Sequence, residues 1–268
     1  MKLSIITINY NNLEGLKRTY ESVVCQTWTD YEWIIIDGGS TDGSREFIEE
    51  HQDKFSYWCS EPDKGVYNAM NKGIAKAKGE YLNFMNSGDS FYETNTLMKV
   101  FSREHEADIV YGDILRIYEE GECIYRFGTI ADIFTLYQHN IPHQAMFIRL
   151  EYHRHHLYDE DFGLMADWKN WVLAALNNVR FEYAPIVVAR YPMDGLSSIH
   201  REKCDKEYEL IKDLFPYAVR QTVEEFESYR NCRSTVRAHL LVRKGGVAAF
   251  ITKGIMKVLA SFFHIRMY

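Results

Sequence analysis

The sequence lacks the features that mark several specialised classes of protein. Its five cysteines are an odd number and form no CxxC pair, so we expect reduced thiols and neither a disulfide framework nor a zinc site. No run of about 18 uninterrupted apolar residues is present, so no transmembrane helix is predicted. The formal net charge is −7 at pH 7 and no basic stripe precedes the C-terminal segment, which argues against nucleic acid as a partner.

The sequence also contains no internal repeat, no low-complexity segment and no signal-peptide pattern. Met1 and Lys2 lead directly into a predicted strand, without a long apolar core or a small-residue cleavage site, so we expect a cytoplasmic protein. A hydrophobic fraction of 46% over 268 residues suits one sizeable α/β domain with an appendage. We predict a domain at residues 1–200 and a C-terminal helical extension at residues 201–268.

Strands and helices alternate over the first 90 residues. Short, nearly continuous apolar runs predict strands at residues 3–9, 31–36, 57–61 and from 79 to the turn before Asp89. Apolar residues at helical spacing predict helices at 13–24, from the turn after Asp37 to about Gln52, and at 66–76. Strands that are apolar throughout are typical of parallel strands covered on both faces. We therefore expect a three-layer α/β/α sandwich with a mostly parallel central sheet.

Polar residues and glycines give the expected ends of these helices. Asn11 or Asn12 is placed to cap the first helix, and one of residues 40–42 the second. Gly79 is placed to end the third.

Beyond residue 90 the pattern is less regular. It predicts a helix at 96–103, a hairpin of 114–118 and 123–127, strands at 145–148 and 181–189, and a helix that opens at 165–168.

Two of the predicted strands end at a carboxylate. Asp37 follows the second strand, and Asp89 follows the fourth after a turn in which Gly88 allows close approach of the backbone. Ligands of open α/β sheets bind beyond the carboxyl ends of the strands, so both are candidates, and Asp37 is placed to accept hydrogen bonds from a nucleotide. The glycines after Asp37 do not spell GxGxxG, which argues against a dinucleotide-binding motif. The structural alternatives are a cap of the second helix for Asp37, and for Asp89 an ordinary turn that caps the helix after Thr94.

Two further candidates lie in the second half of the chain. His143 precedes a predicted strand, where an exposed surface histidine is the alternative. Asp167 lies in the first turn of a helix, where the helix dipole favours an ionised carboxylate, and a simple capping role is the alternative.

Five stretches of the sequence, in this order, resemble family 2 glycosyltransferases with the GT-A fold. They are SIITINYN (4–11), IIDGGSTDGS (35–44), GVYNAMNKGI (65–74), GEYLNFMNSGD (79–89) and AD (166–167). The resemblance covers about residues 1–200 and is densest over the first 90.

The resemblance implies a role for each candidate residue. It implies that a nucleotide-sugar donor contacts Asn9, Tyr10, Asp37, Asn71 and Ser87. It implies that Asp89 binds a divalent cation, Mn²⁺ or Mg²⁺, on the donor diphosphate, that Asp167 is the general base, and that His143 lies on the acceptor side.

Two positions depart from the family pattern. Gly88 stands where the family commonly has a second acid, and Asn68 where it often has aspartate. One protein carboxylate can suffice for the metal, because the phosphates supply other oxygen ligands.

The implied reaction is a single displacement that inverts the anomeric configuration. We expect a UDP-sugar as donor and a hydroxyl of a glycan or lipid-linked glycan as acceptor, in the biosynthesis of a surface polysaccharide or other glycan. A nucleotidyltransferase, the first alternative, would carry a glycine-rich basic loop after the first strand, and residues 10–13 (YNNL) are neither. The second alternative is a degenerate nucleotide-sugar-binding module without turnover, which Gly88 and Asn68 keep open.

The C-terminal segment 244–268 combines an apolar stripe at helical spacing with lysine and arginine residues. That pattern is typical of a helix that lies in a membrane interface, and it predicts peripheral contact with the inner face of the membrane. The alternative is a helix that packs on the catalytic domain or on a second subunit of a homo-oligomer.

Overall fold

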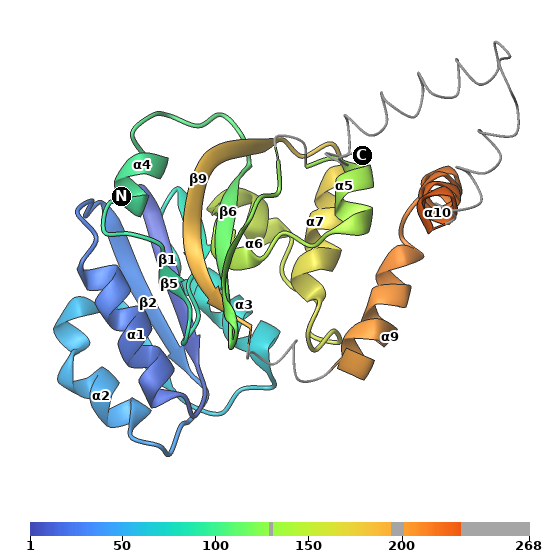
Figure 1. Cartoon of the computed structure of the whole chain (residues 1–268). Coiled ribbons are helices and arrows are strands. Elements are labelled where there is room, and N and C mark those ends of the chain that lie inside the picture. The colour runs from blue at the N-terminus through green and yellow to red at the C-terminus, as the bar shows by residue number, and fades with distance from the viewer. Residues whose placement is uncertain (129–130, 194–200, 232–268) are drawn as a thin grey trace, which may run out of the picture. The chain divides into compact units, whose positions relative to one another are not determined.

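The computed structural model describes residues 1–128, 131–193 and 201–231 (Figure 1). Contacts divide the chain into two units, Met1–Phe215 and Pro216–Tyr268. The first unit contains the sheet and all the candidate residues, and the described part of the second includes the helix α10 (Tyr217–Asn231). The segment 244–268 lies outside the described residues, so the membrane contact predicted for it stays a prediction. None of the helices in the described ranges is long and apolar enough to cross a membrane.

The first unit is built on one mixed sheet with the strand order β3-β2-β1-β4-β8-β6-β9-β5, in which β7 pairs with β6. The strands are β1 (Leu3–Asn9), β2 (Tyr31–Asp37), β3 (Tyr57–Ser60), β4 (Tyr81–Phe84), β5 (Ser90–Phe91), β6 (Ile109–Tyr118), β7 (Gly121–Tyr125), β8 (Met146–Arg149) and β9 (Phe181–Pro192). β1 to β4 pair in parallel, β8 runs antiparallel to β4 and β6, and β9 is parallel to β6. The predicted α/β fold with a mostly parallel central sheet is therefore confirmed.

The helices cover the sheet in the order that its connections require. The helices of this unit are α1 (Leu13–Val24), α2 (Ser44–Glu50), α3 (Val66–Lys76), α4 (Thr96–Val100), α5 (Ile133–Gln138), α6 (Leu150–His155), α7 (Ala166–Leu176) and α9 (Arg201–Lys212), with the short turns η1 (Gln52–Lys54) and η2 (His143–Ala145). From β1 the chain moves outward to β2 and β3 and then returns to β4 on the other side of β1. Because such crossovers are right-handed, α1 and α2 lie on one face and α3 on the opposite face. The strand order therefore reverses between β1 and β4, where open α/β sheets place their ligands.

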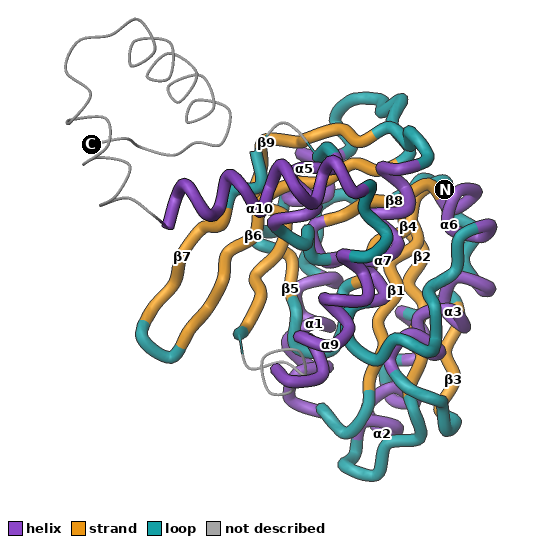
Figure 2. Tube along the Cα trace, turned by 90° about the vertical axis from the view of Figure 1, so that its right-hand side faces the viewer, coloured by secondary structure: helices purple, strands orange, loops and turns teal. Residues whose placement is uncertain are grey.

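Several predicted boundaries hold and others need correction. Asn12 caps α1 as predicted, since its side chain accepts a hydrogen bond from Gly15 N at 3.1 Å. The predicted side-chain cap of α2 is wrong, because its N-cap residue is Gly43 with a φ of +96°, and the helix ends at Glu50. The predicted hairpin is confirmed, with β6 as one long strand that β7 follows and pairs with (Figure 2).

Gly79 does not end α3, which corrects a further prediction. The C-cap of α3 is Ala77. A Cβ atom added to Gly79 would lie 2.6 Å from the backbone of Leu3 and Ser4 in β1. The glycine is therefore required by close approach to β1.

The helix α9 holds the loop in front of α7. Glu207 is 7% exposed, and its carboxylate accepts hydrogen bonds from the backbone N–H groups of Gly163 (2.8 Å), Leu164 (3.0 Å) and Met165 (2.9 Å). Met165 is the N-cap residue of α7 and makes no side-chain cap, so a carboxylate from another helix satisfies donors at this helix end. α9 thus packs within the first unit. The predicted domain division at residue 200 stays a prediction.

A histidine lies buried in an aromatic cluster beneath the sheet edge. The His153 ring centroid lies 4.7 Å from that of Tyr158, 6.0 Å from Phe84 and 6.1 Å from Trp171. Its Nδ1 lies 2.9 Å from the His156 carbonyl oxygen, and its Nε2 has no hydrogen-bond partner in the described ranges. Burial lowers the pKa of His153 from 6.5 to about 4, so the ring is neutral in the folded protein.

We predict that His153 makes the fold sensitive to acid. Between pH 6.5 and about 4 the unfolded chain binds a proton at this ring that the folded chain excludes, so the free energy of unfolding falls as pH falls. In urea unfolding, His153→Phe should lose about 2 kcal/mol less than the wild type between pH 7 and 5. The control His155→Gln changes an exposed ring on the same helix and should follow the wild type. An equal pH dependence for His153→Phe and the wild type would contradict the prediction.

We also predict that Glu207→Ala lowers the free energy of unfolding by about 2–4 kcal/mol, because it leaves three backbone donors without their charged acceptor. Thermal and urea unfolding measure the loss. Glu209→Ala on the same helix removes an exposed carboxylate that pairs only with Lys212 in the described residues, and it should change stability by less than about 0.5 kcal/mol. Similar losses for the two variants would show that the loop does not depend on Glu207.

Candidate functional site

The carboxyl ends of three parallel strands bring polar side chains together. The strand register pairs Asn9 with Asp37 and Asp37 with Ser60. The Asp37 carboxylate is fully buried and accepts hydrogen bonds from Asn9 Nδ2 (2.7 Å), Ser40 Oγ (2.6 Å) and Ser60 Oγ (2.6 Å). Burial acts to raise the pKa of Asp37, but the hydrogen bonds from Ser40, Ser60 and Asn9 outweigh it, so the pKa is lowered. Asp37 is thus ionised and connects the carboxyl ends of β1, β2 and β3 through its hydrogen bonds. It does not cap α2.

Tyr10 and Asp63 pack closely against Gly38, the residue that follows Asp37. Tyr10 is 67% exposed. A Cβ added to Gly38 would lie 3.1 Å from Tyr10 Cδ2 and 2.7 Å from Asp63 Oδ2, so only glycine lets the ring and the carboxylate approach from both sides. The exposed ring leaves a face on which a flat ligand group can stack. Asn9 Oδ1, which is buried next to it, has no hydrogen-bond partner in the described part of the chain.

The turn after β4 is held by α1. Gly88 has a φ of +108°, a backbone conformation that favours glycine. Thr19 Oγ1 accepts a hydrogen bond from Gly88 N (3.1 Å) and donates to the Asp89 carbonyl oxygen (2.7 Å), and Asn12 Nδ2 donates to the Ser87 carbonyl oxygen (3.0 Å). Asn95 is the N-cap residue of α4, so the alternative of Asp89 as part of a helix cap is wrong.

The short turn η2 contacts two carboxylates from different elements. Gln144 Nε2 donates to Asp89 Oδ2 at 2.8 Å, and Asp89 is 6% exposed. The neighbouring His143 has Nδ1 3.2 Å from Asp167 Oδ2 and Nε2 2.9 Å from Asn86 Nδ2. Since the Asn86 amide donates to Nε2, the ring proton lies on Nδ1 and points at Asp167. The alternative of His143 as an exposed surface residue is therefore wrong. The consecutive residues His143 and Gln144 connect the two candidate acids, Asp167 and Asp89.

Asp167 is buried in the first turn of α7. It is 5% exposed, and its Oδ1 accepts hydrogen bonds from Trp168 N (2.7 Å) and the Tyr67 hydroxyl (3.2 Å). Burial and the neighbouring Asp167 charge raise the pKa of Tyr67 well above its ordinary value, so Tyr67 stays a protonated donor. The N-cap residue is Met165, so Asp167 does not occupy the capping position.

Two of the predicted donor-binding residues have different surroundings. Asn71 donates from Nδ2 to the Tyr158 carbonyl oxygen (2.9 Å) and to Glu160 Oε1 (3.0 Å), and its Oδ1 accepts from Tyr158 N (3.0 Å). Its amide therefore ties α3 to the loop before α7. Ser87 Oγ is buried and has no hydrogen-bond partner among the described residues. Donor binding by either residue stays a prediction.

Residues close to Asp89 in the sequence or bonded to it carry oxygen atoms suited to a hard cation. Asn86 Oδ1, Ser87 Oγ and Gln144 Oε1 are buried and lack hydrogen-bond partners in the described ranges. Together with the carboxylate they offer the donor chemistry that Mg²⁺ and Mn²⁺ prefer. The described residues contain no group of three or more His, Cys, Asp or Glu that could hold a metal alone, so a cation here would need ligands from a substrate.

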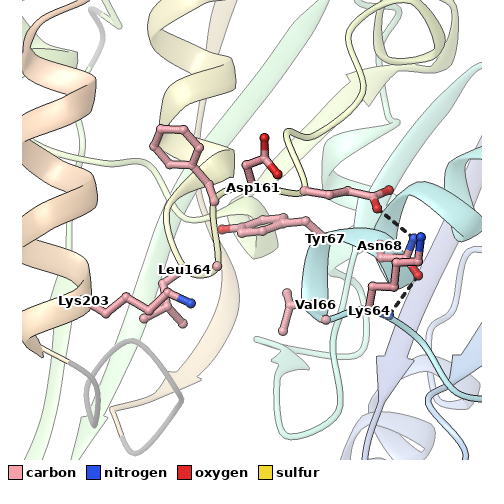
Figure 3. Close-up of a pocket in the computed structure, with 11 residues that line it drawn as sticks. Lys64, Val66, Tyr67, Asn68, Asp161, Leu164 and Lys203 are labelled. Atoms are coloured by element: carbon pink, nitrogen blue, oxygen red, sulfur yellow. Dashed lines mark hydrogen bonds between the residues drawn. The ribbon is translucent and has the colours of Figure 1, made fainter.

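A pocket of about 390 Å³ is lined by residues 64–68, residues 160–164 and Lys203 (Figure 3). Its walls come from the start of α3, from the loop 160–164 and from α9, which contributes Lys203. Tyr67 lines the pocket and carries the hydroxyl that donates to Asp167. The pocket is thus one side chain away from the buried acid.

Sequence reasoning missed the residues that orient the acids. These are Gln144, Asn86 and Thr19. The first two are close in the sequence to predicted site residues and Thr19 is in α1, but nothing in their local sequence pattern shows that their side chains contact the site. Gln144 and Asp89 are 55 positions apart in the sequence. The position of Gln144 directly after His143 was the one feature of the sequence that could have suggested a place for Gln144 in the site.

Comparison with known proteins identifies the family. The model of Glycosyl transferase family 2 matches residues 4–167, from β1 to Asp167. A PGL/p-HBAD biosynthesis glycosyltransferase of Mycobacterium bovis is 33% identical over 196 residues, which cover 70% of this chain and 72% of the relative. An uncharacterized glycosyltransferase of Mycobacterium tuberculosis is 48% identical over 90 residues, 33% of this chain and 34% of the relative.

Solved structures share the fold. The mannosyltransferase PcManGT from Pyrobaculum calidifontis, in complex with GDP-Man and Mn²⁺, superposes with a TM-score of 0.62 at 18% identity over 97% of this chain and 80% of that one. S. aureus TarS 1-349 in complex with UDP-GlcNAc gives a TM-score of 0.61 at 18% identity over 72% of this chain, but the match spans only 58% of the TarS chain. The sheet and its helices match GT-A structures. With the family pattern matched from β1 to Asp167, the chain belongs to glycosyltransferase family 2 and is a glycosyltransferase.

Proposed function

We propose that this enzyme transfers a sugar from a nucleotide-sugar donor, a UDP-sugar, to a hydroxyl group of a glycan or lipid-linked glycan, with inversion at the anomeric carbon. The observation that carries the proposal is the pair of buried acids Asp89 and Asp167, which consecutive residues of η2 contact at 2.8 and 3.2 Å. One acid, Asp89, lies in the turn after β4, and the other, Asp167, accepts a hydrogen bond from Tyr67, which lines a pocket. An inverting transfer needs these two functions, stabilisation of the departing diphosphate and removal of a proton from the acceptor.

The donor would lie over the edge formed by β1, β2 and the turn after β4. Tyr10 offers an exposed ring for the nucleobase, and Asn9 Oδ1 and Ser87 Oγ offer polar atoms without partners in the described part of the chain. Asp37 holds Asn9 in place through a hydrogen bond of 2.7 Å. UDP is supported as the nucleotide by the TarS complexes with UDP and UDP-GlcNAc.

Asp89 would hold a divalent cation, and the side-chain oxygens of Asn86, Ser87 and Gln144, which have no partner among the described residues, are further candidate ligands. When bound, such a cation supplies positive charge against the diphosphate that departs. Gln144 would orient the Asp89 carboxylate, since its amide donates to Asp89 Oδ2 at 2.8 Å.

Asp167 would take the proton of the acceptor hydroxyl. As the acceptor oxygen bonds to the anomeric carbon, the bond from that carbon to the diphosphate oxygen breaks, and its electron pair leaves with the nucleoside diphosphate. Tyr67, Trp168 N and His143 all direct donors at Asp167, and these contacts fix the orientation of its carboxylate. His143 would act through Asp167, on the acceptor side of the site.

The alternatives are less well supported. The turn after β1 is short and carries Asn11 and Asn12, unlike the glycine-rich basic loop of a nucleotidyltransferase, and the family match excludes that class. A thermal-shift screen of nucleoside diphosphates and nucleotide sugars with Mn²⁺ tests the donor class directly, since a ligand that binds only the folded state raises its stability. Stabilisation by GDP or GDP-sugars in place of their UDP counterparts would correct the nucleobase.

We predict that Asp89→Asn weakens binding of the donor much more in Mn²⁺ than in EDTA. The amide keeps the shape of the side chain but loses the charge that holds the cation. Titration calorimetry with UDP in the two buffers measures the difference. If the wild type and Asp89→Asn bound UDP equally well in Mn²⁺, Asp89 would not be the metal ligand.

We predict that Asp167→Asn keeps the affinity for the donor but lowers transfer by about 10²–10⁴-fold, because the base acts on the acceptor proton and not on the nucleotide. Release of UDP in the presence of acceptor measures transfer, and calorimetry measures donor binding. A variant with wild-type turnover and a lowered melting temperature would instead assign Asp167 a purely structural role.

A further inference from the structure

The pocket beside Asp167 has an apolar side and a polar side. Val66, Tyr67 and Leu164 supply apolar or aromatic surface, and Lys64, Asp161 and Lys203 supply charged groups. In Figure 3 the labelled side chains come from α3, the loop 160–164 and α9 and surround one space. A pocket of about 390 Å³ is within the range of small-molecule sites.

The charged groups of the pocket have unused hydrogen-bonding capacity. Within the described residues, the ammonium groups of Lys64 and Lys203 and the carboxylate of Asp161 form no hydrogen bond or ion pair. Glu160 is different, since Asn68 Nδ2 (2.9 Å) and Asn71 Nδ2 (3.0 Å) occupy its carboxylate. The pocket therefore offers donors and an acceptor together, with two positive and two negative charges in its lining.

This combination fits a neutral sugar ring. Each sugar hydroxyl both donates and accepts hydrogen bonds, so it can use an ammonium group and a carboxylate in one site. The C–H groups of the ring can pack on Val66, Tyr67 and Leu164. A lipid chain would leave the charged groups without partners, and the balanced charge offers no net attraction to an anion.

The helix α9 fixes one wall of the pocket. A Cβ added to Gly163 would lie 2.5 Å from Lys203 Cε, so glycine allows the lysine to lie directly on the loop. Glu207, one helical turn further, binds the backbone N–H groups of residues 163–165. Glu207 therefore joins the loop to α9, the helix that carries Lys203.

We propose that this pocket is the acceptor subsite and that it binds the terminal, uncharged sugar residue of the acceptor. The inference rests on the proposed function, because only a glycosyl transfer gives the acceptor a place beside Asp167. Tyr67 contacts the sugar with its ring and Asp167 with its hydroxyl, so it joins the subsite to the base. Lys203 and Asp161 bind the sugar hydroxyls and decide which sugar is accepted.

The test uses a panel of neutral methyl glycosides as probes with the full-length enzyme. Release of UDP from a UDP-sugar is measured with each glycoside, and saturation-transfer NMR measures glycoside binding without donor. At least one neutral glycoside should bind and accelerate UDP release. Lys203→Ala and Asp161→Asn should each raise the KM for that glycoside about tenfold with the UDP Kd of the wild type, whereas Lys206→Ala, on an exposed position of the same helix, should leave the KM unchanged.

Several outcomes would overturn the inference. Tighter binding of the corresponding glycosiduronate or sugar phosphate would show an anion site, and a change in UDP Kd for the pocket variants would show a donor site. Unchanged KM in both variants, or no glycoside binding by NMR, would remove the acceptor subsite. Failure of the proposed function looks different, because the wild type would then neither bind UDP nor release it from a UDP-sugar, while the NMR measurement would still report on the pocket.

Discussion

The structure around the site depends on the stabilisation of buried carboxylates. Asp37, Asp89, Asp167 and Glu207 are at most 7% exposed, and removal of a charge from water is costly unless hydrogen bonds replace the lost hydration. The donors include amides, hydroxyls and one imidazole from other elements of the chain. Each carboxylate therefore fixes the elements that carry its donors. Through these bonds β1 is joined to β2, the turn after β4 to η2, α7 to α3, and the loop before α7 to α9.

Neutral donors stabilise a carboxylate without cancelling its charge. In the described residues, Asp37, Asp167 and Glu207 form no ion pair with lysine or arginine, and their negative charge remains at the site. A base must keep its charge in order to accept a proton, so this arrangement suits Asp167. The same negative edge would repel a diphosphate, which gives a divalent cation at Asp89 a physical purpose in the proposed reaction.

The elements that local pattern determines could be predicted from the sequence, and the contacts between distant residues could not. β1 is apolar throughout because both faces are covered, and α1 and α3 show a clear helical stripe, so their bounds were predicted correctly. Gly79 was misassigned because the sequence cannot distinguish a glycine that ends a helix from one that admits a neighbouring strand. Local pattern made Asp89, Asp167 and His143 candidates, and the resemblance supplied the role predicted for each of them. Gln144 and Glu207 escaped notice, since a polar residue gives no sign of burial when its partner is more than 40 positions away.

In the proposed reaction, α9 takes part in recognition of the acceptor, and the carboxylates at the sheet edge take part in catalysis. The family pattern ends at Asp167, and Lys203 and Glu207 lie beyond it. Glu207 is buried and holds the loop, so its replacement would disturb the approach to Asp167. Lys203 is exposed and supports no core packing, so its replacement would change the pocket without a comparable loss of stability. Acceptor preference can therefore change on one face of α9 while the carboxylates at the sheet edge keep their geometry.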